Sequence, residues 1–176
     1  MELISTNIKD VKLIFPDIIK DQRGSFFESY QYEKYIPFIG DIKFIQDNES
    51  VSKYGVLRGL HYQKYPCQQS KLIRVIKGKI QDVVVDIRSE SPTYKKYVSI
   101  ELSDENKYEL FIPHGFAHGF LVLSNEAIVS YKVDNYYNKE LDSGYKYDDP
   151  SFGIKWNLND KDIILSDKDK SLPYIK

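Results

Sequence analysis

The stretch KLIRVIKGKIQDVVVDI, residues 71–87, decides the fold class of this chain. It contains two runs rich in Ile and Val, 71–76 and 79–87, with Lys77 and Gly78 between them. β-Branched residues pack well on a pleated, half-buried surface, and a glycine-containing pair between two such runs is a turn signal. The stretch therefore predicts two strands separated by a turn.

Other short segments repeat this pattern of β-branched and aromatic residues. Gly, Pro, Ser and Asn residues separate them, for example at Ser91-Pro92 and at Pro113-His114-Gly115. Helical periodicity is weak except near residues 31–35 and in the charged C-terminal tail, so only short peripheral helices are expected. Many short strands at this spacing favour an antiparallel sandwich or jelly roll. We therefore predict an all-β, double-sheet sandwich or barrel with further strands at 11–15, 42–46, 97–102, 108–112, 119–123 and 127–133.

The bulk composition is that of an ordinary globular domain. The 176 residues are 41% hydrophobic and 29% charged, so we expect a single domain over residues 1–176. Cys67 is the only cysteine, so neither an intramolecular disulfide nor a cysteine-based zinc site is expected, and a reducing cytoplasm is the expected compartment. The start, MELISTNIKD, lacks the features of a signal peptide, and no apolar run approaches the roughly 20 residues of a membrane span. We expect neither export by that route nor membrane insertion.

The charge balance argues against a nucleic-acid partner. The net charge is −1 and the pI is about 6.3, with lysines scattered among acidic residues rather than gathered in a basic stripe. Any phosphate that this chain binds is therefore expected to belong to a small ligand. The fifteen tyrosines are interpreted as strand-forming bulk.

The segment GVLRGLHYQ, residues 55–63, places polar side chains on a predicted strand. Side chains alternate between the two faces of a strand, so Arg58 and His61 would diverge if this strand were regular. A small jelly-roll barrel has room for one small ligand at its open mouth. Both residues could reach such a ligand only if the strand contains a bulge or bend, which Gly59 would permit.

The three histidines, His61, His114 and His118, do not form a recognisable metal motif. A metal-binding cupin would place a second histidine two residues after the first, and Gln63 stands there. His114 and His118 are four residues apart, but the prolines and glycines around them argue against the helix that would present both to one zinc ion. We therefore predict no metal site.

Several separated motifs, in this order along the chain, resemble those of the dTDP-4-dehydrorhamnose 3,5-epimerase family of the cupin superfamily. The resemblance covers essentially the whole chain, and GVLRGLHYQ together with IPHGFAHGF is its most specific part. It implies a cupin-type jelly roll and a reaction that needs no cofactor. The motifs are DQRGSFFESY (21–30), QDNES (46–50), GVLRGLHYQ (55–63), KLIRVIKG (71–78), VDIRSESPTY (85–94), LFIPHGFAHGFLVLS (110–124), YKVDNYY (131–137) and LSDKD (165–169).

The resemblance implies four catalytic residues. His61 would be the base, held and polarised by Asp169, and Tyr131 would be the acid on the opposite face of the sugar ring. Lys71 would stabilise the enolate oxygen, because a positioned positive charge stabilises negative charge as it develops. The chemistry suits these residue types, since imidazole is the side chain best able to accept a proton near neutral pH. Composition alone does not identify which histidine or tyrosine would act.

The resemblance also implies a nucleotide-sugar site. Arginine suits phosphate because its planar fork donates two hydrogen bonds, and aromatic rings can stack on a nucleoside base. In relatives the residues that match Phe26 and Glu28 come from the neighbouring subunit, so the expected assembly is a homodimer with shared active sites. The matching substrate-binding positions are Arg23, Phe26, Glu28, Gln46, Asn48, Arg58, His118, Tyr137, Asp142 and Lys168.

Three positions depart from the family pattern. Asp142 is one methylene shorter than the usual Glu, and Tyr147 replaces a Trp, in a segment expected to border the nucleotide end of the site. His114 stands where Glu is common and is expected to be only a polar loop residue. These departures bear on nucleotide and sugar specificity rather than on the catalytic positions.

The leading hypothesis is double epimerisation, at C3 and C5, of a nucleotide-linked 4-keto-6-deoxyhexose. The ketone acidifies the protons on both neighbouring carbons, so no redox cofactor is needed. Two other enzymes remain open, namely a single-position epimerase or 3,4-ketoisomerase and a metal-dependent cupin oxygenase. A sugar-nucleotide-binding cupin without catalytic activity is the alternative from a different class.

Overall fold

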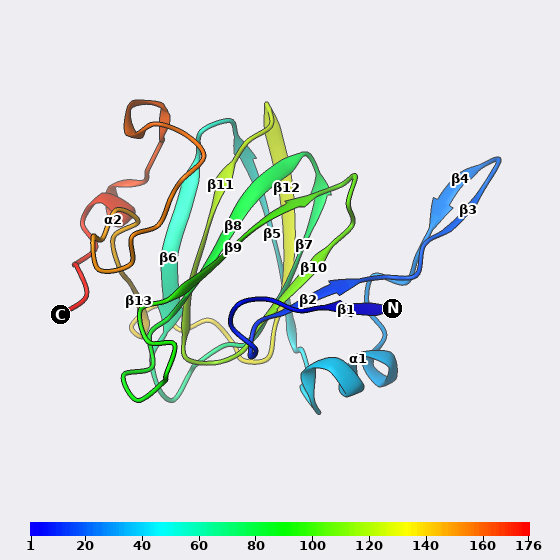
Figure 1. Ribbon diagram of the computed structural model, residues 1–176, viewed down its shortest axis with the longest axis horizontal. Helices are drawn as coiled ribbons and strands as arrows, with labels where there is room; N and C mark the ends of the chain where they lie inside the picture. The colour runs from blue at the N-terminus through cyan, green and yellow to red at the C-terminus, as the bar shows by residue number, and fades with distance from the viewer.

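The computed structural model describes residues 1–176, and its two large sheets are antiparallel (Figure 1). One sheet has six strands in the order β1 (Glu2–Ile4), β2 (Lys12–Phe15), β10 (Glu109–Ile112), β7 (Lys71–Lys77), β12 (Glu126–Val133) and β5 (Gln46–Lys53). The other has five strands in the order β13 (Asp142–Gly144), β6 (Leu57–Gln63), β11 (Phe116–Val122), β8 (Lys79–Asp86) and β9 (Tyr97–Ser103). The predicted all-β double-sheet fold is confirmed.

The remaining elements are short and lie at the edges of the sandwich. A separate hairpin joins β3 (Ile19–Asp21) to β4 (Gly24–Phe26) and projects away from both large sheets (Figure 1). Helix α1 (Tyr32–Ile39) follows the hairpin, while the 3₁₀ turn η1 (Asp160–Asp162) and helix α2 (Asp167–Lys170) belong to the C-terminal segment. No helix is both long and apolar enough to span a lipid bilayer.

The main core lies between the two large sheets. Alternate residues of the strands point inward, such as Ile73 and Val75 on β7 and Val84 on β8, and all three are buried. Burying each such side chain contributes roughly 1.5–3 kcal/mol. The core fills only part of the space between the sheets, because Gln46, Asn48 and other polar side chains line the end described below.

Two smaller apolar clusters cover the outer faces of the sheets. On the six-stranded sheet, α1 packs Tyr35 and Ile39 against Leu72 and Phe111. On the five-stranded sheet, Phe152 packs against strand residues in a cluster that the C-terminal segment covers. β8 and β11 are therefore buried on both faces, and the buried residues of β8 include the polar side chains of Gln81, Asp82 and Asp86.

The prediction of a strand at 42–46 is wrong. Ile42 and Phe44 are irregular in backbone and pack against the cluster under α1. The strand instead occupies the polar sequence QDNESVSK, β5, which starts at Gln46. A polar strand forms here because one of its faces lines a cavity rather than the apolar core. The three-residue strands β1, β3, β4 and β13 were also not predicted, since each is too short to show periodicity.

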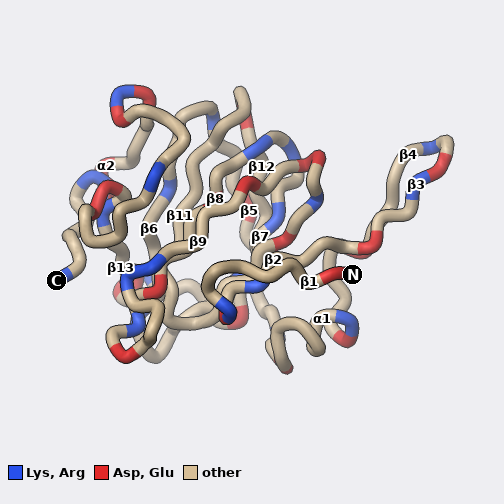
Figure 2. The backbone as a smooth tube through the Cα atoms, viewed as in Figure 1, with Lys and Arg blue, Asp and Glu red and all other residues tan.

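Acidic and basic residues are interspersed along the chain. Figure 2 shows Lys and Arg interspersed with Asp and Glu along the backbone, in keeping with the net charge of −1. Helix α2 alone contains two residues of each sign.

Candidate active site

The site begins with a bulge in β6. Against β11, His61 is opposite His118 and Arg58 is opposite Phe120, so three steps along β6 match two steps along β11. Gly59 has φ +138°, and a Cβ there would collide with the backbone of β11. The bulge turns Arg58 and His61 toward the same cavity, as the sequence required for a shared ligand.

Two adjoining cavities open between the sheets. They have volumes of about 520 and 290 Å³ and share His61, Lys71 and Tyr131. The larger is also lined by Ser50, Val56, Leu57, Arg58, His118, Phe120, Ile164, Leu165, Ser166, Lys168 and Asp169. The smaller is also lined by Gln46, Asn48, Tyr62, Gln63, Gln69, Tyr137 and Asp142.

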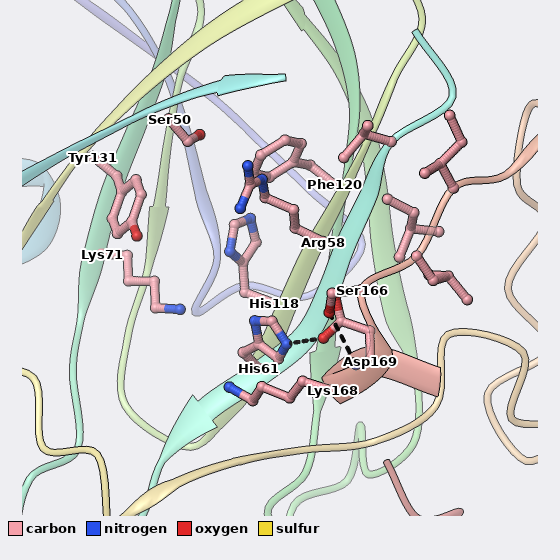
Figure 3. A pocket seen from close by; sticks show the side chains of 14 residues that line it. Ser50, Arg58, His61, Lys71, His118, Phe120, Tyr131, Ser166, Lys168 and Asp169 are labelled. Carbon is pink, nitrogen blue, oxygen red and sulfur yellow. Dashed lines mark hydrogen bonds and ion pairs between the residues drawn. The ribbon is translucent and has the colours of Figure 1, made fainter. Parts of the chain in front are cut away.

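His61 and Asp169 form a buried dyad. The Nε2 atom of His61 lies 2.5 Å from Oδ1 of Asp169, and the Asp169 side chain is 4% exposed (Figure 3). Ser166 caps helix α2 by accepting a hydrogen bond from the backbone N–H of Asp169. Burial acts to raise the pKa of Asp169, but the hydrogen bond and charge of His61, the hydroxyl of Ser166 and the charge of Lys168 together outweigh burial, and the pKa is lowered. Asp169 is therefore held as a carboxylate against Nε2, which leaves Nδ1 of His61 available to a ligand.

The imidazole of His61 is supported from behind by β13. Gly144 is opposite His61 in the pairing of β13 with β6. A Cβ at Gly144 would lie 3.2 Å from Cδ2 of His61 and 3.0 Å from Leu172. Such a Cβ would also collide with the carbonyl oxygen of Leu60, so only glycine allows β13 to approach β6 this closely beside the His61 ring.

Tyr131 and Lys71 face the dyad from the other sheet. Tyr131 lies on β12 and Lys71 on β7, both in the six-stranded sheet, whereas His61 lies on β6 in the five-stranded sheet. Figure 3 shows Tyr131 and Lys71 on one side of the cavity and His61 with Asp169 on the other. Burial raises the pKa of Tyr131, so its hydroxyl stays protonated. Burial lowers the pKa of Lys71 to about 8, while the carboxylates of Asp82 and Asp142 oppose that shift.

Polar groups form a chain at the mouth of the smaller cavity. The hydroxyl of Tyr137 donates to Asp142 at 2.8 Å, and Lys168 forms an ion pair with the same carboxylate. Asn48 accepts a hydrogen bond from the amide of Gln46 at 2.8 Å. The shorter Asp142 therefore reaches both Tyr137 and Lys168, and all five side chains line the two cavities that His61 shares.

Three predicted substrate residues lie away from the cavities. Arg23 is 85% exposed in its side chain and pairs with Asp21, and Phe26 is 65% exposed. Glu28 pairs with Lys34 of helix α1. Arg23 and Phe26 belong to the projecting β3–β4 hairpin and Glu28 follows it, so within one chain these residues do not complete the site.

Two of the residues that depart from the family pattern lie outside these cavities. Within the segment expected to border the nucleotide end, Asp142 lines the smaller cavity, whereas Tyr147 lines a separate cavity with Trp156, whose Nε1 donates to the Tyr147 carbonyl. His114 is a loop residue as expected, and its Nε2 lies 3.0 Å from Asp134. No group of three or more His, Cys, Asp or Glu side chains is arranged to hold a metal ion.

Sequence reasoning missed several residues of the site. Asp82, on β8, is fully buried and lies 3.0 Å from His118 through both carboxylate oxygens. A charged residue directly before the three valines of DVVVD, residues 82–86, was a sequence signal for a buried functional group. Ser50 lines the larger cavity, and its buried hydroxyl oxygen has no hydrogen-bond partner. The alternation of Gln46, Asn48 and Ser50 on one face of β5 could have revealed it.

The chain is similar to known proteins over its full length. Residues 5–176 match the family model described as dTDP-4-dehydrorhamnose 3,5-epimerase. The protein of that name from Methanothermobacter thermautotrophicus is 47% identical over 96% of this chain and 91% of its own. A dTDP-6-deoxy-D-glucose-3,5-epimerase from Legionella pneumophila, solved in complex with dTDP-4-keto-L-rhamnose, superposes with a TM-score of 0.95 at 45% identity, covering 98% of this chain and 92% of that one. A dTDP-4-dehydrorhamnose 3,5-epimerase from Bacillus anthracis, with TDP and pyrophosphate bound, gives a TM-score of 0.95 at 44% identity, covering 99% of each chain.

Proposed function

The chain belongs to the dTDP-4-dehydrorhamnose 3,5-epimerase family, and we propose that the residues around the His61–Asp169 dyad perform the epimerisation. The reaction is an isomerisation of dTDP-4-dehydro-6-deoxyglucose to dTDP-4-dehydrorhamnose in dTDP-rhamnose synthesis. One observation carries the proposed mechanism. A candidate base and a candidate acid face one cavity from opposite sheets, which is the arrangement that inversion of a ring carbon needs.

In the first step, Nδ1 of His61 removes a proton from the carbon next to the C4 ketone. Asp169 supports this role because it holds Nε2 at 2.5 Å, so the lone pair is left on Nδ1. The carboxylate also stabilises the imidazolium that forms when the proton is taken up. The two electrons of the C–H bond move onto the ketone oxygen and give an enolate.

Lys71 and Tyr131 complete the inversion. The Lys71 ammonium stabilises the negative oxygen of the enolate, and a positioned charge of this kind acts strongly in a partly buried site. Tyr131 then donates its hydroxyl proton to carbon from the opposite face. Solvent restores the tyrosine proton and removes the proton from His61, so each inversion replaces one C–H hydrogen with a solvent hydrogen.

The same groups act twice, at C3 and at C5. Both carbons are adjacent to the C4 ketone, so each proton is acidified without a change in oxidation state. The two hydrogens leave from the face that His61 covers, and the replacements arrive from the face that Tyr131 covers. We therefore propose one catalytic pair for two epimerisations.

The nucleotide part of the substrate binds along the polar walls of the two cavities. Arg58 lies beside Ser52, which accepts its Nε–H at 3.0 Å, and its remaining donors suit a phosphate group. Tyr137 offers an aromatic face, 52% exposed, for a nucleoside base. The other proposed contacts, to the nucleotide sugar as a whole, come from Gln46, Asn48, His118, Asp142 and Lys168.

We propose that the active enzyme is a homodimer in which the β3–β4 hairpin completes the partner's site. Ile19 and Phe26 are 64% and 65% exposed, which is unusual for apolar residues of a hairpin and indicates a missing contact surface. Arg23 at the hairpin turn and Glu28 beyond β4 would supply polar contacts to the same partner site. A two-fold axis would give both sites the same composition.

We further propose that residues 1–176 unfold as one domain and that the enzyme works in the cytoplasm. The continuous core between the sheets supports the first proposal, which a single calorimetric transition would test. The lone Cys67 supports the second, because it leaves the chain without an internal disulfide. Fractionation of the source cells would test the location.

The test of the reaction is incubation with dTDP-4-keto-6-deoxyglucose in heavy water, followed by NMR. Deuterium is expected at both C3 and C5, together with product of inverted configuration after trapping by reduction. Deuterium at one carbon alone would mean that the enzyme epimerises a single position rather than two. No deuterium at either carbon would contradict the proposed function.

Two variants test the catalytic roles. His61→Ala is expected to reduce turnover by a factor of about 10² to 10⁴, the usual contribution of general acid–base catalysis, while the protein still folds. His114→Ala is the matched control, because His114 lies outside both cavities. Tyr131→Phe is expected to slow product formation more than it slows deuterium exchange, since it removes only the acid. Near-normal turnover in His61→Ala would overturn the assignment of the base.

The shared-site proposal has its own test. Phe26→Ala is expected to raise KM for the nucleotide sugar, and Tyr174→Ala, another exposed aromatic, is the control. Mixing inactive His61→Ala protein with Phe26→Ala protein is expected to restore activity. In a mixed dimer, one site combines the intact His61 of one chain with the intact Phe26 of the other. Activity that does not rise on mixing would contradict a shared site.

A further inference from the structure

Asp82 is a buried carboxylate next to the cavity that the proposed mechanism does not use. It lies on β8 and is fully buried. Both of its carboxylate oxygens are 3.0 Å from Nε2 of His118, which lies on the adjacent strand β11. A buried carboxylate is costly to desolvate even when it is paired, so its position beside a site points to a use for its charge.

The contact with Asp82 determines which nitrogen of His118 carries the proton. An ionised carboxylate only accepts hydrogen bonds, so Nε2 of His118 must be the N–H donor. Nδ1 makes no hydrogen bond with the protein. Burial lowers the pKa of His118, although Asp82 opposes this shift, so the ring is neutral near pH 7. Nδ1 therefore keeps a lone pair that can accept a hydrogen bond from a hydroxyl group in the cavity.

Asp82 also acts on Lys71 across the space between the sheets. The salt bridges of the site join His61 to Asp169, His118 to Asp82 and Lys168 to Asp142, and none of them includes Lys71. Burial lowers the pKa of Lys71 to about 8, and the charge of Asp82 is the larger of two carboxylate effects that limit the decrease. The charged and titratable groups that line the two cavities with Lys71, or act on it, are Asp82, Asp142, Asp169, Lys168, Arg58, His61, His118, Tyr62, Tyr131 and Tyr137.

We propose that Asp82 is a positioning residue of the epimerisation, which fixes the proton of His118 on Nε2 and holds Lys71 in its cationic form. This inference rests on the proposed function, which assigns Lys71 to the enolate oxygen, and it adds that His118 accepts a hydrogen bond from a hydroxyl of the bound sugar. Asp82 itself touches no reacting atom. It acts through the two side chains that face the substrate.

The first test is NMR of the substrate-free protein, which does not depend on activity. With ¹³C-labelled lysine, the Lys71 titration midpoint is expected near pH 8 in the wild type and about one pH unit lower in Asp82→Asn, as a nearby charge typically shifts a pKa by one to three units. With ¹⁵N-labelled histidine, wild-type His118 is expected as the Nε2–H tautomer. An unchanged Lys71 midpoint, or the Nδ1–H tautomer in the wild type, would overturn the proposal. The tautomer measurement holds even if Asp82→Asn fails to fold.

The second test is the pH profile of kcat/KM. The high-pH limb reports loss of the Lys71 cation and is expected to move to lower pH in Asp82→Asn by the same amount as the NMR midpoint. Asp86→Asn is the matched control, because Asp86 is also fully buried on β8 but bonds to Arg88, Ser91 and Thr93. This control is expected to lower the melting temperature and leave the limb in place. If the high-pH limb of the kcat/KM profile does not move in Asp82→Asn, the proposal is contradicted. If the wild type is inactive, the proposed function is refuted, and the NMR result alone decides the role of Asp82.

Discussion

Asp82 and Glu109 are both fully buried carboxylates, but Asp82 serves the active site and Glu109 serves the packing of the fold. Asp82 lies on the five-stranded sheet beside the cavity. Glu109 lies on β10 of the six-stranded sheet, where the hydroxyl of Tyr35 from helix α1 donates to it at 2.6 Å. The first has an imidazole N–H against both oxygens, while the second has one neutral donor and an oxygen, Oε1, without any partner.

The two carboxylates differ in the partners that surround them. Burial raises the pKa of Glu109 to about 7, and the hydrogen bond from Tyr35 and the charge of Arg74 reduce that increase only in part. Glu109 is therefore largely neutral below pH 7 and behaves as a packing residue under α1. Asp82 lies near two side chains that can hold positive charge, Lys71 and His118, so a carboxylate there is useful to the site.

Among the changes that test this comparison, the largest effect is expected from Lys71→Met, which removes the cation whose pKa the charge of Asp82 raises. Turnover is expected to fall by a factor of about 10² to 10³, as for the loss of a single group that stabilises an oxyanion. Stability should hold or rise, because methionine needs no solvation in a partly buried position. Steady-state kinetics and urea denaturation measure the two quantities.

Lys77→Met is the matched control for this change. Lys77 lies on the same strand and makes only an exposed ion pair with Glu126, so its loss should alter neither quantity. Normal turnover in Lys71→Met would show that the Lys71 cation is not needed for catalysis, and the proposed use of the Asp82 charge would then fail.

The sequence predicted the residues of the cavity better than it predicted their partners. His61, Lys71 and Tyr131 were identified by resemblance, and the structure brings them to one cavity with Asp169. Physical reasoning contributed the bulge at Gly59, because alternation along GVLRGLHYQ otherwise separates Arg58 from His61. Asp82 was missed because a contact between β8 and β11 depends on strand register, which a single sequence does not specify.

Strand β5 illustrates the same limit at the level of the fold. Apolar pattern predicted a strand at 42–46, but Ile42 and Phe44 pack against a cluster under α1. The polar residues that follow form the strand, because the cavity wall replaces the core on one of its faces. Periodicity of apolar residues identifies strands whose inward side chains enter the core. It misses a strand such as β5, because the inward side chains at a functional site are polar.

A smaller effect, on stability alone, is expected from Glu109→Gln. The folded-state pKa of Glu109, about 7, is above its ordinary value of 4.5. Its contribution to stability is therefore fully present below pH 4.5 and is lost as the pH rises through 7. Glutamine resembles the protonated acid, so the variant should be more stable than the wild type by on the order of 3 kcal/mol at most at pH 8, and by less than about 1 kcal/mol at pH 5.

Urea denaturation of both proteins at pH 5 and pH 8 checks this prediction, with kcat/KM expected to stay unchanged. Glu101→Gln is the control, since Glu101 is half-exposed and pairs with Lys79 on the surface. A stability difference that is the same at both pH values would mean that Glu109 stays charged in the fold, and the contrast with Asp82 would fail.

The smallest effect is expected from Tyr35→Phe, which removes the one donor to Glu109 and leaves the packing of the ring in place. At pH 8 the change should cost about 1–3 kcal/mol, because a partly ionised carboxylate loses its only hydrogen bond in a buried position. At pH 5 the cost should be lower, since Glu109 is protonated there and has less charge to satisfy. Denaturation at the two pH values measures the difference, and the deuterium-exchange rate at C3 and C5 should stay at the wild-type value. An equal cost at both pH values would show that the Tyr35 hydroxyl stabilises α1 independently of the Glu109 charge, and the neutral state of Glu109 would then have to rest on burial alone.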